Sequence, residues 1–99
     1  MESPQKATDN MKKGVTVNIY GRVQNVGFRY YTQKKAQDLN IRGYVQNMPD
    51  GSVYAEAEGE PEKVDRFIDF CRKGPGWARV DKVNVQQAPV KEQNEFKIR

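Results

Sequence analysis

The sequence predicts a small α+β domain in which an antiparallel sheet carries two helices on one face. Three observations favour this fold class. The 99 residues suffice for one domain, since single domains most often have about 100–150 residues. Eleven valines against one leucine favour strands. Apolar patterns of strand and helix periodicity follow one another in the order βαββαβ, with a short extra strand at the C-terminus.

The first predicted elements are a strand over residues 15–20 and a helix over residues 28–40. In the strand, apolar residues alternate with polar ones up to Gly21: Val15, Val17 and Ile19. In the helix, the spacing places one set of side chains on a single face: Phe28, Thr32, Ala36 and Leu39. Each element therefore has one side that is suited to burial.

A β-hairpin is predicted next. Residues 43–47 and 52–58 both alternate, and the sequence Pro49-Asp50-Gly51 lies between them. Proline fixes φ and glycine permits positive φ, so this tripeptide suits a tight connection between two antiparallel strands.

The second helix and two further strands complete the chain. Pro61 suits the first helical position, and Gly74-Pro75-Gly76 ends the helix. Its apolar face comprises Val64, Phe67, Ile68 and Cys71, whereas the valines of a strand follow at Val80, Val83 and Val85. Phe96 and Ile98 predict a short last strand. Because both crossovers must be right-handed, this order predicts a ferredoxin-like βαββαβ sandwich.

The composition limits the functions that the chain can have. The formal net charge of +4 favours anionic ligands, and the absence of histidine excludes histidine relays and histidine–zinc sites. Cys71 is the single cysteine, which excludes an intrachain disulfide and suits a reducing cytoplasm. Residues 1–13 lack apolar periodicity and are expected to form a flexible tail before a domain spanning residues 14–99. Neither a signal peptide nor a membrane span is expected.

The segment from Gly21 to Arg29 is the first candidate for chemistry. It joins the first strand to the first helix, and its two glycines and Asn25 permit a backbone curl in which successive N–H groups converge. The positive end of the helix dipole begins at the same place, so the segment is suited to cradle an anion. An arginine in the first helical turn could add a bidentate contact. The ordinary alternative is a plain strand-to-helix turn with a solvated arginine.

Asn47 is the second candidate. Asparagine is a poor strand former, and its simplest interpretation is that it begins the hairpin turn. The first and second strands can end on the same rim of this fold. The carboxamide could therefore hold a water molecule beside an anion in the cradle.

The motifs at these positions resemble the acylphosphatases. The matching residues are Gly21-Arg22-Val23-Gln24-x-Val26-Gly27-Phe28-Arg29, then Tyr31-Thr32, then Gly43-x-Val45-x-Asn47-x-x-Asp50-Gly51-x-Val53. The match continues through Gly59-x-Pro61, Ala78-x-Val80-x-x-Val83 and Phe96-x-Ile98-Arg99, so that it covers about residues 14–99. The resemblance implies the same βαββαβ sandwich.

The resemblance also implies an activity: hydrolysis of carboxyl-phosphate anhydrides to a carboxylate and phosphate, without metal or cofactor. Arg29 would bind the phosphate and Asn47 would orient the attacking water. The backbone of residues 24–28, namely Gln24, Asn25, Val26, Gly27 and Phe28, would form the phosphate cradle. The family usually has glycine where this chain has Asn25, and asparagine is the residue besides glycine that best tolerates left-handed φ. Inorganic phosphate would act as a product inhibitor, and a monomer is expected.

Other functions were weighed against this one. A thiol phosphatase needs an arginine six positions after its cysteine, and Trp77 stands there instead. The P-loop sequence is missing as well. Two alternatives stay open: a nucleic-acid-binding module that stacks bases on Tyr44 and Tyr54, and a regulatory relative that binds carbamoyl phosphate with little turnover. We expect that the chain binds neither nucleic acid nor a membrane.

Overall fold

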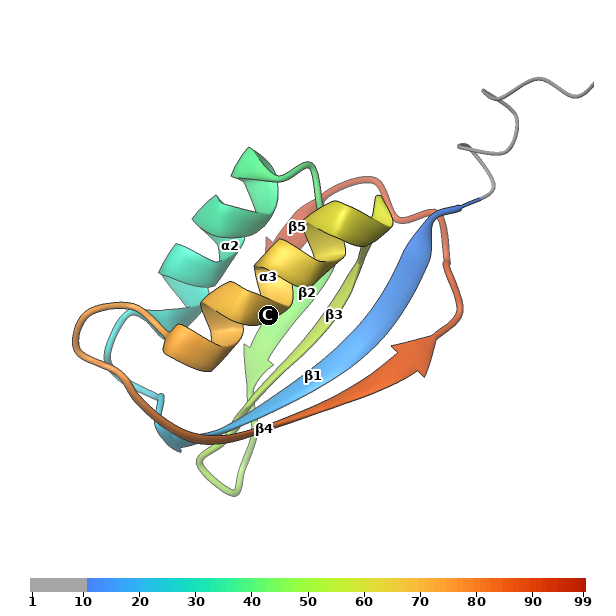
Figure 1. Cartoon of the computed structure of the whole chain (residues 1–99). Helices are drawn as coiled ribbons and strands as arrows, with labels where there is room; N and C mark the ends of the chain where they lie inside the picture. Colours follow the sequence, from blue (N-terminus) through green and yellow to red (C-terminus); the bar gives the residue numbers. More distant parts are fainter. Residues whose placement is uncertain (1–10) are drawn as a thin grey trace, which may run out of the picture.

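The computed structural model describes residues 11–99, which form two helices packed on one face of a five-stranded sheet (Figure 1). The α+β fold class and the predicted element order are confirmed. The elements, in chain order, are β1 (Lys13–Arg22), α2 (Phe28–Asp38), β2 (Arg42–Asn47), β3 (Val53–Gly59), α3 (Pro61–Lys73), β4 (Arg79–Ala88) and β5 (Phe96–Ile98).

The sheet has the strand order β4-β1-β3-β2-β5. Its first four strands pair antiparallel, as expected for the ferredoxin-like plan. β5 pairs parallel to β2, with Val45 opposite Ile98, so the complete sheet is mixed. The sequence left this direction open. Parallel pairing brings the last residues of the chain to the end of the sheet where β2 finishes.

The core lies between the sheet and the two helices. β1 buries its predicted alternating residues, and α3 buries its predicted apolar face: Val64, Phe67, Ile68 and Cys71. The valines of β4 are only partly buried against this core. Phe96 of β5 reaches the same core, where its ring centroid lies 5.7 Å from that of Phe67. This contact anchors the short last strand to the helix layer.

The strand β1 bends at its end before it enters the first loop. Its register against β4 shifts between Tyr20 and Gly21, and Gly21 has a φ of 135°. A Cβ atom at this position would lie 2.2 Å from the carbonyl oxygen of Arg79, so only glycine fits. The bulge thus sets the direction in which the chain leaves the sheet.

Most of the predicted flexible tail, residues 1–13, lies outside the described part of the chain. Residues 1–10 of the expected tail are not described, and Lys13 already belongs to β1, where it pairs with Gly59. Strand pairing therefore begins one residue earlier than the domain boundary expected at residue 14.

Candidate active site

The loop between β1 and α2 and the hairpin between β2 and β3 lie at the same end of the sheet (Figure 1). A side chain joins them. Nε2 of Gln24 donates hydrogen bonds to the backbone oxygens of Met48 (2.8 Å) and Ser52 (2.9 Å). The two segments that hold the predicted site residues are therefore tied together directly.

The β1–α2 loop has the backbone curl that the sequence predicts. Asn25 has a φ of 62° and Gly27 a φ of 78°, so both residues are in the left-handed region. Gly27 is the N-cap of α2 and supplies no side-chain cap, which leaves N–H groups of the first helical turn without a partner inside the helix. Left-handed residues beside a helix start bring backbone N–H groups together, and this geometry suits a bound anion.

A pocket of about 180 Å³ opens at this loop. Among the predicted site residues, it is lined by Asn25, Gly27, Phe28, Arg29 and Asn47. Asn47 is the last residue of β2, and the structure brings it to the same pocket as the arginine of α2. The remaining lining residues, Val23, Tyr30 and Ile98, were not predicted from the sequence.

Two predicted cradle residues, Gln24 and Val26, do not line the pocket. The side chain of Gln24 is directed to the hairpin, and Val26 is half-buried against the core. Gln24 thus ties the loop to the hairpin, and Val26 ties it to the core. The amide of a glutamine can donate to any backbone oxygen within reach. The sequence therefore could not indicate that Gln24 bonds to the oxygens of Met48 and Ser52.

Arg29 is positioned by the last residue of the chain. Its Nη1 atom donates a 3.0 Å hydrogen bond to the backbone oxygen of Arg99. The backbone N–H of Arg99 in turn donates to the carbonyl oxygen of Val45 (2.8 Å), which continues the pairing of β5 with β2. β5 therefore holds the guanidinium in place, a role that the sequence did not reveal.

Hydrogen bonds within the turn that follows Asn47 stabilise the hairpin between β2 and β3. Oδ1 of Asp50 accepts hydrogen bonds from the hydroxyl (2.5 Å) and the backbone N–H (2.9 Å) of Ser52, and these bonds lower the pKa of the Asp50 carboxyl. The backbone N–H of Met48 donates to Ser52 (2.8 Å). A rigid turn fixes the point at which β2 ends, and with it the position of Asn47.

Cys71 is a core residue, as its place on the helix face predicts. It is fully buried, and burial raises the pKa of its thiol to about 12. A thiol in this state is a poor nucleophile at neutral pH, because the thiolate is the reactive form.

Tyr44 and Tyr54 lie on the sheet face opposite the helices and pack against each other, with ring centroids 6.0 Å apart. The guanidinium of Arg99 lies 3.8 Å from the centroid of the Tyr44 ring, and the Tyr44 hydroxyl donates to Oε2 of Glu56 (3.3 Å). Burial raises the pKa of both phenols, and Glu56 adds to the rise in each. The two rings pack on each other across neighbouring strands, and the Arg99 guanidinium covers the Tyr44 ring, so both rings have partners within the sheet.

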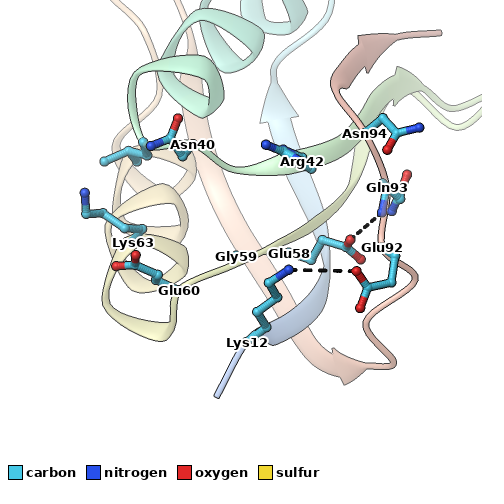
Figure 2. A pocket seen from close by; sticks show the side chains of 11 residues that line it. Lys12, Asn40, Arg42, Glu58, Gly59, Glu60, Lys63, Glu92, Gln93 and Asn94 are labelled. Atoms are coloured by element: carbon cyan, nitrogen blue, oxygen red, sulfur yellow. Dashed lines mark hydrogen bonds and ion pairs between the residues drawn. The ribbon is translucent and has the colours of Figure 1, made fainter. Parts of the chain in front are cut away.

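A second hollow, of about 250 Å³, is shown in Figure 2. Its wall includes Arg42, the first residue of β2, whereas Asn47 is the last residue of that strand. Glu58 in its wall is 5 % exposed, and its carboxylate accepts the backbone N–H groups of Lys91 (2.8 Å) and Gln93 (2.7 Å). The Nζ atom of Lys12 lies 3.8 Å from Oε1 of Glu92. These contacts hold the connection between β4 and β5, so the buried carboxylate of Glu58 has a structural role.

Two searches for other kinds of site complete the description. Over residues 11–99, no helix has the length and apolar character needed to cross a membrane. In the same part of the chain, no three carboxylate or thiol side chains come together as a candidate metal site.

Comparisons with known proteins assign the family. Residues 15–98 match the sequence model of the acylphosphatases. An acylphosphatase of Acaryochloris marina is 48% identical over 81% of this chain and 86% of its own length, and one of Leuconostoc mesenteroides is 44% identical over 88% and 98%. The solved structure of a Coxiella burnetii acylphosphatase superimposes with a TM-score of 0.88 at 30% identity, over 93% of this chain and 97% of that one. The chain therefore belongs to the acylphosphatase family, whose members hydrolyse acyl phosphates.

Proposed function

We propose that the pocket between the β1–α2 loop and Asn47 is the active site at which this chain hydrolyses acyl phosphates. The observation that supports this most is that Arg29, Asn25 and Asn47 line one pocket at the start of α2. A cation and fixed N–H donors can stabilise the charge of a phosphoryl group, and a carboxamide can position a water molecule. The family's activity and the local chemistry thus agree.

In the proposed reaction, the phosphoryl group sits in the backbone curl of residues 24–28, and Arg29 donates to its oxygens. Phosphoryl transfer passes through a loose transition state whose charge is spread over three oxygens, so fixed N–H donors and a guanidinium stabilise it. One Nη1 hydrogen bond of Arg29 goes to Arg99, and the guanidinium retains further N–H donors for the ligand. Arg29 therefore binds the phosphate and keeps its orientation at the same time.

Asn47 is proposed to orient the attacking water. The water oxygen forms a bond to phosphorus while the bond from phosphorus to the carboxyl oxygen breaks, and both hydrogens of the water remain with the product phosphate. The leaving carboxylate has an ordinary conjugate-acid pKa of about 4, so it departs without a general acid. No histidine is needed, and we propose that no metal or cofactor takes part.

The test is an acyl-phosphate hydrolysis assay on the wild-type chain and the Asn47→Ala variant. We expect the wild type to hydrolyse acetyl phosphate, with a rate that EDTA does not change. Asn47→Ala should lose about 100-fold in kcat, because the water is no longer held in line, and should still be inhibited by inorganic phosphate. An Asn47→Ala variant with the wild-type kcat would contradict the assignment of the water to this residue.

The assay also separates the two alternatives. A nucleic-acid-binding module would bind RNA with a steep salt dependence and would not turn over acyl phosphates. A regulatory relative would bind the ligand without turnover. We expect hydrolysis, and no RNA binding above the level of an unrelated protein with the same net charge.

Three finer features are also proposed. Inorganic phosphate inhibits competitively, because the product makes the same contacts as the phosphoryl group of the substrate. The chain acts as a monomer, which sedimentation at the concentration of the assay tests. It works in the cytoplasm, where the free thiol of Cys71 stays reduced.

A further inference from the structure

We propose that Tyr30 and Ile98 form the contact surface for the acyl group, and that this chain prefers acyl phosphates with an aromatic or branched apolar acyl group. This inference rests on the proposed function. Tyr30 and Ile98 both line the pocket that contains Arg29, although they come from α2 and β5.

The size of the pocket directs the acyl group to its rim. Its volume is about 180 Å³. Pockets that enclose a whole drug-sized ligand have roughly 300–1,000 Å³. In the proposed reaction the phosphoryl group and the attacking water lie beside Arg29 and Asn47, which are partly buried. We therefore place the acyl group against the exposed lining residues, Tyr30 and Ile98.

Tyr30 and Ile98 offer exposed apolar surface to a ligand in this pocket. Tyr30 is 53% exposed and Ile98 is 39% exposed. Tyr30 directly follows Arg29 in the chain, and Ile98 directly precedes Arg99. The 3.0 Å hydrogen bond between Arg29 and Arg99 therefore joins the two segments that present these side chains. A substrate whose phosphate contacts Arg29 brings its acyl group to this apolar pair.

The ring of Tyr30 is held in place by its neighbours. The Tyr31 ring packs against it edge-on, with centroids 5.1 Å apart and planes at 76°, and the ammonium of Lys34 lies 5.8 Å from the Tyr30 centroid. Tyr31 in turn covers Gly27, where a Cβ atom would lie 3.3 Å from the Tyr31 ring. Tyr30 is thus connected to the cradle loop, and less side-chain entropy is lost when an acyl group packs on it. The nearby ammonium disfavours cationic acyl groups.

The experiment compares benzoyl phosphate with acetyl phosphate as substrates. We measure the ratio of their kcat/KM values for the wild type, Tyr30→Ser, Tyr30→Phe and Ile98→Ser. Tyr20→Ser is the matched control, because Tyr20 also has a lysine ammonium over its ring, that of Lys82 at 5.7 Å, and lies outside the pocket. All three positions are at least partly exposed, so the variants should fold.

We expect the benzoyl-to-acetyl ratio to fall about tenfold in Tyr30→Ser, and less in Ile98→Ser, because the apolar contact is lost for the larger acyl group only. The ratio should stay within about twofold of the wild type in Tyr30→Phe and Tyr20→Ser. A ratio that Tyr30→Ser and Ile98→Ser both leave unchanged overturns this inference and leaves the proposed function intact. A wild type that hydrolyses neither substrate overturns the proposed function, and this inference with it.

Discussion

The Nη1 atom of Arg29 donates a 3.0 Å hydrogen bond to the backbone oxygen of Arg99, which is 70 residues further along the chain. Arg99 is itself paired with Val45 through its backbone N–H (2.8 Å). The proposed phosphate-binding group is therefore oriented by the mixed edge of the sheet as well as by its own helix.

Arg29→Ala should abolish both turnover and inhibition by phosphate, because the guanidinium is proposed to contact the anion in the ground state and in the transition state. Arg29→Lys should not restore activity, since lysine lacks the planar fork. The fold should survive, because the substitution removes one partly exposed hydrogen bond, with a net value of about 1 kcal/mol. The measurements are kcat/KM, the phosphate inhibition constant and circular dichroism. A variant that keeps more than about a tenth of the wild-type kcat/KM would falsify the assignment.

Asn25 has a left-handed φ of 62°, which suits the proposed cradle. Asn25→Gly should keep or raise kcat/KM, because glycine adopts this φ without strain. Asn25→Val should lower kcat/KM and weaken phosphate inhibition, since a β-branched residue disfavours left-handed φ. Equal values for the two variants would show that residue 25 does not shape the loop. Loss in the glycine variant alone would show that the amide side chain takes part.

Gln24→Glu should separate the loop from the hairpin. A carboxylate has no N–H to donate to the oxygens of Met48 and Ser52 and would repel both. We expect a loss of about 2 kcal/mol in the free energy of unfolding, from urea titration, together with weaker phosphate inhibition. Gln37→Glu, at an exposed position of α2, introduces the same charge and serves as the control. If both variants have the wild-type stability and phosphate inhibition, the two hydrogen bonds do not hold the site together.

Cys71 should make stability depend on pH in the alkaline range. Below pH 9 the thiol keeps its proton whether the chain is folded or unfolded. Above its ordinary pKa of 9.0 the unfolded chain loses that proton while the folded chain, with the thiol pKa at about 12, retains it. The free energy of unfolding should therefore fall by about 1.4 kcal/mol per pH unit relative to Cys71→Ala. Urea titrations between pH 8 and 10.5 measure the difference, and the tyrosines with raised pKa cancel because both proteins contain them. Parallel curves for the two proteins would refute the prediction.

The helices and strands that could be predicted from the sequence are those whose own residues mark their ends or their buried face. α3 runs from Pro61 to Lys73, as the proline at its start and Gly74 at its end indicate, and Gly74 has a φ of 75°. β4 extends to Ala88, beyond the last valine of its pattern, because its backbone continues to pair with β1 where polar residues carry no periodicity. The short β5 is the opposite case, since three residues contain no information about strand direction.

In the candidate site, too, some features could be predicted from the sequence and others could not. Asn25, Gly27 and Arg29 could be recognised because they are adjacent in the chain and their residue types suit one loop. The partners of Arg29 and Gln24 are backbone oxygens of distant segments. Every residue has a carbonyl oxygen, so no pattern of side chains in the sequence distinguishes these acceptors. The roles of Arg29 and Asn47 in the reaction stay predictions until the variants are measured.

The three-residue strand β5 should also be among the first parts of the sheet to unfold locally. In the sheet formed by residues 11–99 it is an edge strand that pairs with β2. Phe96 in the core and the hydrogen bonds of Glu58 to the preceding connection hold it in place. Edge segments with few ladder bonds detach at a lower free energy than the central strands, so the amide of Arg99 should exchange its hydrogen sooner than those of β1. Each such opening releases Arg29. Enzymatic activity should consequently decline at lower urea concentrations than the circular dichroism of the helices and the central sheet.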